Sequence, residues 1–265
     1  MTASPSSPKP FYVKGDDGAF HPNRNAGSPW LSGHQNGLAL GGLFAQALMQ
    51  APPPEGMNIA RFTLDILRPA PMAPTVASWT RLRDGRRTSA MTGRLVAGGV
   101  ETAVASALFV RKPEDGVPGT PSPIPAILPE DAPDEFMLPL KTGLEARLIR
   151  RGAAHDLTTG ACWVRSLSRL DADTPLHPIV AVVMACDFGV GLSSGLDRQA
   201  WSSPSLDLAI HFIRSPRDEW TLIEADTLMP GNGAALVDMR LSDRFGLFGR
   251  ANLTMAVFPG GAHAQ

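Results

Sequence analysis

Residues 62–69 read FTLDILRP, and residues 208–214 read LAIHFIR. Each segment has the length of one β-strand and runs into an arginine, Arg68 in the first and Arg214 in the second. The elements expected around these two segments also follow one another in the same order. Similar segments in the same order within one chain indicate an internal repeat. We therefore expect two copies of one structural unit.

A segment rich in proline and acidic residues, residues 113–139, separates the two copies. Proline removes backbone hydrogen-bond donors and disfavours both helices and central strands. The sequence therefore predicts an N-terminal unit over residues 1–112, a linker over residues 113–139 and a C-terminal unit over residues 140–265.

Each unit is expected to hold one apolar helix followed by strands. The first helix is expected over residues 41–51, before three prolines, and the second over residues 176–186, with glycine soon after to stop it. Strands are expected at residues 11–14, 59–67, 75–82, 89–96 and 102–110, and again at residues 144–149, 161–167, 206–213, 220–228, 234–241 and 247–258. The four strands after the first helix are expected to form an antiparallel meander. A helix against a curved antiparallel sheet buries the apolar faces of both, so the sequence predicts an α+β pseudo-dimer.

Composition limits the partners of the chain. Lys+Arg 24 against Asp+Glu 25 gives a formal charge of -1, which does not favour nucleic acid or an anionic membrane surface. No apolar run is long enough to span a bilayer, and the first ten residues lack the core of a signal peptide. Cys162 and Cys186 lie far apart and show no metal-ligand spacing. We expect a cytoplasmic protein with no metal or other cofactor.

Several short motifs occur in a fixed order along the chain. They are Gly41-Gly42, FTLDILRP at 62–69, RLRDGRR at 81–87, Trp163-Val164-Arg165, His177 followed by Asp187-Phe188, and LAIHFIR running into Glu219-Trp220. In these motifs the chain resembles the thioesterase-like double-hotdog proteins related to type II acyl-CoA thioesterases. The resemblance covers nearly the whole chain and implies a double hotdog, in which each repeat has a central helix against a curved antiparallel β-sheet. It also implies hydrolysis of an acyl-CoA to a carboxylic acid and free coenzyme A, without a cofactor. A carrier protein could present the acyl thioester in place of coenzyme A.

The resemblance also implies positions for the catalytic residues. In that family the thioester carbonyl faces the amino end of a central helix, where free N–H groups can stabilise an oxyanion; here we expect that role at Gly42. The family's aspartate, which activates water, falls on Asp187, and its threonine partner falls on Ser205. The family's glutamine falls near Thr254, whose side chain is shorter and carries no amide. Asp187 has a second reading as a structural turn residue.

Further residues are candidates for substrate binding. Gly41, His34 and Asn36 lie close to the expected helix start, where they could border the acyl cleft or serve only for capping and packing. Arg86 and Arg87 belong to a cluster of arginines at one turn. Those arginines could bind the phosphates of coenzyme A, or they could belong to a solvated hairpin.

Two other functions stay open on the sequence. Asp65 and His211 occupy corresponding positions in the two repeats, and as an acid–base pair they would suit an acyl-CoA hydratase, dehydratase or isomerase. That reading predicts that His211→Ala abolishes activity while Asp187→Asn does not. Loss of the family's glutamine would also suit a non-catalytic acyl-CoA binding protein. Exposed sheet edges suggest a homodimer.

Overall fold

The computed structural model describes residues 9–29, 31–51, 55–113, 116–135, 143–197 and 199–260. The elements of the first half are β1 (Tyr12–Lys14), β2 (Phe20–Pro22), η1 (Arg24–Ala26), α1 (Gly37–Gln50), β3 (Met57–Ile66), β4 (Thr75–Asp84), β5 (Thr88–Ala97) and β6 (Val100–Arg111). Those that follow are η2 (Pro129–Asp131), β7 (Asp134–Glu135), β8 (Leu144–Arg150), β9 (Gly160–Ser166), α2 (Pro178–Cys186), α3 (Phe188–Ser193), β10 (Trp201–Ser202), β11 (Asp207–Phe212), β12 (Thr221–Leu228), β13 (Ala234–Asp243), β14 (Gly246–Ala256) and β15 (Phe258–Pro259).

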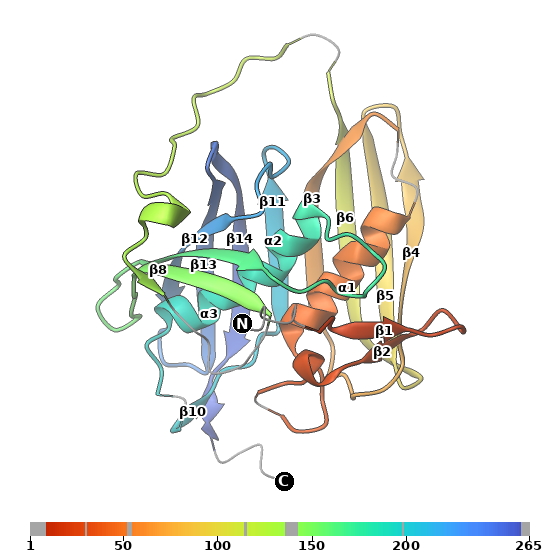
Figure 1. Ribbon diagram of the computed structural model, residues 1–265, viewed down its shortest axis with the longest axis horizontal. Helices are drawn as coiled ribbons and strands as arrows, with labels where there is room; N and C mark the ends of the chain where they lie inside the picture. The colour runs from red at the N-terminus through yellow and green to blue at the C-terminus, as the bar shows by residue number, and fades with distance from the viewer. Residues whose placement is uncertain are drawn as a thin grey trace, which may run out of the picture.

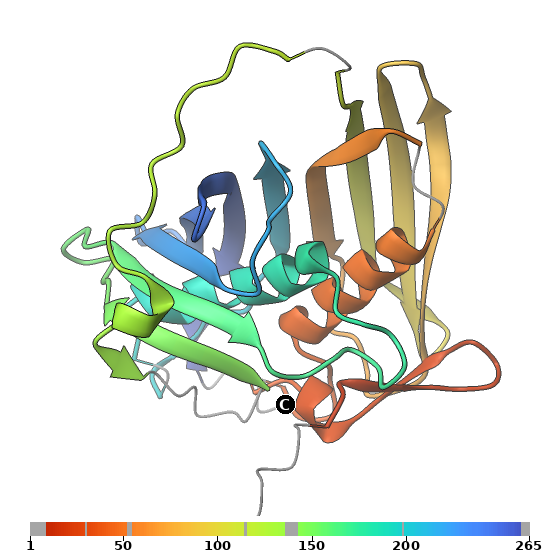
Figure 2. The same ribbon diagram turned by 45° about the horizontal axis from the view of Figure 1, so that its top comes forward.

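One curved sheet wraps around the helices (Figures 1 and 2). Its strand order is β1-β2-β4-β5-β6-β3-β11-β14-β13-β12-β9-β8-β7. The two halves meet where β3 pairs with β11 in antiparallel register, with Leu64 opposite Leu208. Both leucines are buried, and their neighbours on each strand alternate towards the outer face, as a half-buried sheet requires. The expected α+β double-repeat fold is confirmed.

The strand order corrects one expectation. β4, β5 and β6 form a meander, but β3 pairs with β6 instead of β4. The second half repeats this order, because β11 pairs with β14 beyond the meander of β12 and β13. This placement puts β3 and β11 at the centre of the molecule, where each can pair with the strand of the other half.

The repeat extends to individual backbone hydrogen bonds. The N–H groups of Leu67 and Arg68 both donate to the Thr102 carbonyl, at 2.9 and 3.3 Å. Those of Ile213 and Arg214 both donate to the Phe248 carbonyl, at 2.9 and 3.5 Å. The expected correspondence of Arg68 with Arg214 is therefore confirmed.

Helix α1 begins four residues earlier than the glycine pair suggests. Asn36 is its N-cap, and the Asn36 side chain accepts a hydrogen bond of 2.7 Å from the backbone N–H of Ala39. Gly41 and Gly42 consequently lie in the second turn, packed against Val183 and Met184 of α2. A Cβ on Gly42 would approach Met184 Cγ to 2.8 Å, so glycine here permits close packing of the two helices.

The second helix does not stop at glycine as expected. Asp187 has helical backbone angles and joins α2 directly to α3. The element α3 was not predicted, because its sequence is short and includes Gly189. That glycine packs against Met239, where a Cβ would lie 2.5 Å from the sulfur atom.

The N-terminal segment and the linker both contact the second half. Phe11 and Tyr12 donate backbone hydrogen bonds to Arg169 and Leu170 of the second half. After β6 the chain runs as an extended segment over the outside of the molecule to the second half (Figure 1). There Trp163 Nε1 donates to the Ile127 carbonyl at 2.9 Å. Residues 114–115 and 136–139 of the expected linker, and residues 140–142 of the expected C-terminal unit, lie outside the described residues. The domain boundaries at 112/113 and 139/140 stand as proposals.

Candidate active site

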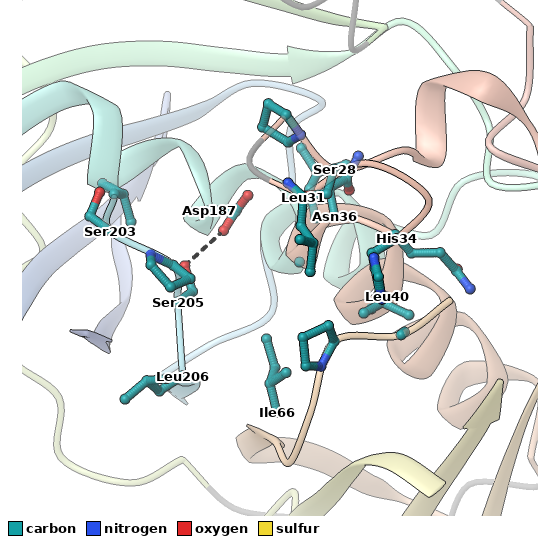
Figure 3. A pocket seen from close by; sticks show the side chains of 18 of the residues that line it. Ser28, Leu31, His34, Asn36, Leu40, Ile66, Asp187, Ser203, Ser205 and Leu206 are labelled. Carbon is teal, nitrogen blue, oxygen red and sulfur yellow. Dashed lines mark hydrogen bonds between the residues drawn. The ribbon is translucent and has the colours of Figure 1, made fainter. Parts of the chain in front are cut away.

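A cavity of about 350 Å³ opens between the two halves at the start of α1. The first half contributes the loop before α1, the first turn of α1 and the end of β3 with the loop that follows it. The second half contributes the junction of α2 and α3 and residues 202–206. Figure 3 shows side chains from both halves converging here. The site therefore exists only when the two repeats are packed together.

Asp187 is the acidic residue in the wall of this cavity. It lies at the junction of α2 and α3, with its carboxylate towards the first half (Figure 3). Ser205 Oγ donates a hydrogen bond of 3.3 Å to Asp187 Oδ1. Burial raises the pKa of Asp187, while the hydrogen bond from Ser205 acts in the opposite direction. A carboxylate of this kind is a stronger base than an exposed aspartate.

The first turn of α1 faces Asp187. A side-chain carbon added to Gly37 would lie 3.4 Å from Asp187 Oδ1. The N–H of Ala39 is capped by Asn36, whereas the N–H groups of Gly37 and Leu38 have no acceptor among the residues that the structure describes. Two free donors and the positive end of the helix dipole thus lie beside the carboxylate.

The sequence interpretation missed these two donors because it placed the helix start at Gly41. Gly42 N–H belongs to the second turn, and its Cα is packed against Met184 and Leu170, so an oxyanion role for Gly42 is wrong. Gly41 is likewise buried, with Val183 of α2 and Leu64 of β3 as its neighbours. Asn36-Gly37 was the signal that could have located the helix start, because asparagine is a favoured N-cap.

Of the other residues expected near the helix, both His34 and Asn36 line the cavity. Asn36 is mainly a structural residue, since its side chain also donates to the carbonyls of Asn25 and Gly27. His34 Nδ1 lies 2.9 Å from the Ser32 carbonyl. Ser203, which the sequence interpretation did not select, lines the cavity beside Ser205, and its hydroxyl has no hydrogen-bond partner among the described residues (Figure 3).

Thr254 is not brought to the cavity. It alternates with Leu253 and Met255, which are buried in the core, so its side chain lies on the outer face of β14. Its backbone carbonyl accepts a hydrogen bond of 2.8 Å from Leu206. The residue opposite Ser205 is Met255, through an isolated bridge. A difference of one residue along a strand moves a side chain to the other face, which sequence matching alone could not detect.

Asp65 and His211 do not form a pair. Asp65 lies opposite Asp207 and His211 opposite Arg61, so the two residues are separated by four positions, or about 13 Å, along the seam. Both side chains are exposed on the outer face of the sheet, away from the cavity. The acid–base pair expected for a hydratase or isomerase is therefore wrong for this structure.

Arg86 and Arg87 lie at the far end of the first half. Their turn adjoins Arg111, which pairs with Met57 at the start of β3, whereas the cavity lies at the other end of that strand. A ten-residue strand spans about 30 Å. The expected contact of these two arginines with a coenzyme A bound in the cavity is not supported, and both are exposed hairpin residues.

Solved structures of other proteins have a fold similar to that of this chain. The chain shares its double-hotdog architecture with acyl-CoA thioesterase II TesB2 from Mycobacterium marinum (21% identity, 84% of this chain and 90% of that one, TM-score 0.66). It is also similar to the tesB protein of Mycobacterium avium subs paratuberculosis (17% identity, 91% and 93%, TM-score 0.66). A protein with the hot dog fold from Alicyclobacillus acidocaldarius gives 21% identity, 91% and 92% coverage, and a TM-score of 0.68. No curated protein matches the chain.

Sequence profiles define the family. The acyl-CoA thioesterase N-terminal domain matches residues 26–110, and the acyl-CoA thioesterase C-terminal domain matches residues 118–257. The chain belongs to the acyl-CoA thioesterase family and is a thioester hydrolase. Within the part of the chain that the structure describes, there is no helix with the length and apolar character needed to cross a membrane.

Proposed function

We propose that the chain hydrolyses acyl-CoA thioesters with Asp187 as general base and the N–H groups of Gly37 and Leu38 as oxyanion donors. The observation that carries this proposal is the approach of the Asp187 carboxylate to the first turn of α1 within one cavity. A base and an anion-stabilising group that face the same space can act on opposite sides of one reacting carbonyl.

The reaction that these groups support has two steps. Asp187 removes a proton from a water molecule as the water oxygen attacks the thioester carbonyl carbon. The carbonyl electron pair moves to oxygen, and the N–H groups of Gly37 and Leu38 stabilise the resulting oxyanion. When the carbonyl re-forms, the carbon–sulfur bond breaks, and protonated Asp187 returns its proton to the leaving sulfur. The products are a carboxylic acid and the free thiol of coenzyme A.

The environment of Asp187 suits this role. Burial raises the pKa of Asp187, which makes its carboxylate a better proton acceptor near neutral pH. The hydrogen bond from Ser205 fixes one carboxylate oxygen and leaves the other for water. Ser203 lies on the same segment, and its hydroxyl, which has no partner in the described part of the chain, is a candidate to hold the same water molecule or the substrate carbonyl.

The cavity wall supports an acyl substrate. Apolar side chains make up much of it, among them Leu31, Leu40, Ile66, Phe188 and Val190. Such walls fit a hydrocarbon chain, while the few polar groups at Asp187 would fix the position of the thioester. We propose that the acyl chain lies against these side chains and that coenzyme A extends towards solvent.

Release of free thiol from a panel of short, long and aromatic acyl-CoAs tests the proposal. The parent protein is expected to release thiol, and Asp187→Asn is expected to lower kcat about 10²- to 10⁴-fold with little change in KM, because the general base is lost. Asp226→Asn, which changes an exposed carboxylate on the outer face, is the matched control and is expected to retain activity. Full activity of Asp187→Asn would contradict the proposed role.

A further inference from the structure

Two equivalent arginines have opposite surroundings in the two repeats. In the second repeat, Arg214 is held by Asp243: Nη1 donates to Oδ2 at 2.8 Å, and Nη2 donates to Oδ1 at 2.6 Å. Asp243 is fully buried and also accepts from the backbone N–H groups of Arg217 and Phe245. Arg214 is therefore a structural residue whose charge is neutralised within the fold.

The first repeat has no carboxylate at the position of Asp243. Asp243 ends β13 and pairs with Gly246 at the start of β14. The equivalent end of β5 is Ala97, which pairs with Val100 at the start of β6. Ala97 is buried and carries no polar group, so it cannot bind Arg68 as Asp243 binds Arg214.

Arg68 is consequently available to a ligand. Its guanidinium has no ion pair or hydrogen bond with any of the residues that the structure describes, and its side chain is exposed. Arg68 also lines the cavity that contains Asp187, and among the described lining residues no other side chain carries a permanent positive charge. A free guanidinium beside a substrate cleft offers planar, paired donors to an anionic oxygen group.

We propose that Arg68 binds an anionic oxygen group of the thioester substrate at the mouth of the cleft. This inference rests on the proposed function, because it assigns a role within the same cleft. Two parts of a substrate can supply this chemistry: the phosphates of coenzyme A, or a carboxylate at the far end of the acyl group. The repeat comparison supports the role, because the first repeat keeps the arginine but lacks the acid that would neutralise it.

Steady-state kinetics with three substrates separates the sources. The substrates are an acyl-CoA, the same acyl group on N-acetylcysteamine, which lacks phosphates, and an ω-carboxyacyl N-acetylcysteamine thioester. Arg68→Gln is expected to raise KM about 10- to 100-fold for an anionic substrate, which is the usual effect of losing a charge-assisted hydrogen bond. It is expected to leave kcat unchanged, and to leave the KM of the neutral thioester unchanged. A rise in KM for acyl-CoA identifies the phosphates as the group that Arg68 binds, and a rise in KM for the ω-carboxyacyl thioester identifies the carboxylate.

Arg94→Gln is the matched control, because it removes one positive charge from an exposed site of the same half, on the outer face of β5. Equal behaviour of Arg68→Gln and Arg94→Gln on all three substrates would overturn the proposal. An equal rise in KM for the neutral thioester would also overturn the proposal, since the effect would not depend on an anion. The KM of Arg68→Lys for an anionic substrate is expected to lie between those of the parent and Arg68→Gln, because lysine keeps the charge but lacks the paired donors.

A second variant tests the repeat argument directly. Ala97→Asp introduces at this position the acid found in the second repeat. It is expected to raise the KM of anionic substrates as much as Arg68→Gln does. If Ala97→Asp does not fold, the Arg68 variants still decide the question. Calorimetric binding of coenzyme A and of an ω-carboxyacyl thioester needs no turnover, so unaltered binding of both by Arg68→Gln overturns the inference even if the parent hydrolyses nothing.

Discussion

Each repeat has a cavity at the start of its main helix, and the two helix starts offer different backbone donors. At the cleft that contains Asp187, Gly37 is the first residue of α1, and its N–H has no acceptor among the described residues. The second cavity, of about 340 Å³, lies at the start of α2, where the first residue is Pro178. Proline has no N–H, and the next donor, Ile179 N–H, is capped by His177 Nδ1 at 3.1 Å. The fold repeats its backbone but does not repeat this donor.

The carboxylate differs as well. Asp187 lies nine residues after the first residue of α2, and the residue at the same distance along α1 is Gln46. Helix α1 continues through Gln46, whose Nε2 donates to the buried Asp171 at 2.5 Å. Helix α2 ends at that position, which presents Asp187 to the cavity. The residues that line the second cavity all belong to the second half and include Asp218 and Glu219 but not Gln46. That cavity therefore does not repeat the arrangement in which one half places a carboxylate opposite the helix start of the other.

Transferring the proline of the second cleft to the first gives the largest expected effect. Gly37→Pro removes one oxyanion donor and should lower kcat about 10²- to 10³-fold, measured by thiol release from an acyl-CoA. The fold should tolerate this change, because proline is favoured at the first helical position and Asn36 already has the extended backbone that proline requires.

Gly37→Ala is the matched control for that experiment. It adds a Cβ at an ordinary contact distance from Asp187 but keeps the N–H. If Gly37→Ala loses as much kcat as Gly37→Pro, steric change and not the missing donor explains the result. Retention of kcat by Gly37→Pro would show that the difference between Gly37 and Pro178 does not determine which cleft is active.

Removing the hydroxyl beside Asp187 should have a smaller effect. Ser205→Ala should lower kcat about 10-fold, in line with the net value of one hydrogen bond. It should also shift the acidic limb of the pH–rate profile upwards, because the hydrogen bond from Ser205 lowers the pKa of Asp187. Ser205→Thr keeps the hydroxyl and should restore both kcat and the profile. An unshifted acidic limb in Ser205→Ala would show that Ser205 does not control the base.

Burial of Asp187 predicts a stability effect opposite to the catalytic one. The pKa of Asp187 is raised on folding, so its contribution to stability is present below the ordinary value of 3.8 and is lost as pH rises through the raised value. Asp187→Asn should therefore raise Tm at neutral pH, by about 2–4 °C for each kcal/mol that it adds to the free energy of unfolding. The difference from the parent should shrink in acid; a lower Tm for Asp187→Asn at neutral pH would contradict this account.

The smallest effect is expected on the outer face. His211→Ala removes an exposed side chain on the side of the sheet away from the cavity, so thiol release should stay within about two-fold of the parent, as for most surface changes. Asp65→Asn should behave in the same way. Loss of activity in either variant would indicate chemistry at the seam of β3 and β11, contrary to the comparison of the two clefts.

The sequence by itself determined the repeat, the fold class and the position of most strands. Alternating apolar residues and turn signals are local properties, so β4, β5 and β6 were placed within a few residues of their observed bounds. Asp187 and Ser205 were selected through the family resemblance, and the structure brings them within 3.3 Å of each other. The sequence also indicated that Arg68 and Arg214 are equivalent.

The tertiary structure decided which residues share a face and which parts of the two halves meet. The pairing of β3 with β6, the position of Thr254 on the outer face and the separation of Asp65 from His211 depend on long-range register. The start of α1 at Gly37 matters only because the second half places Asp187 opposite it. Likewise, Arg68 and Arg214 look alike in sequence. Their difference arises because Asp243 binds Arg214, whereas the equivalent strand position in the first repeat is Ala97.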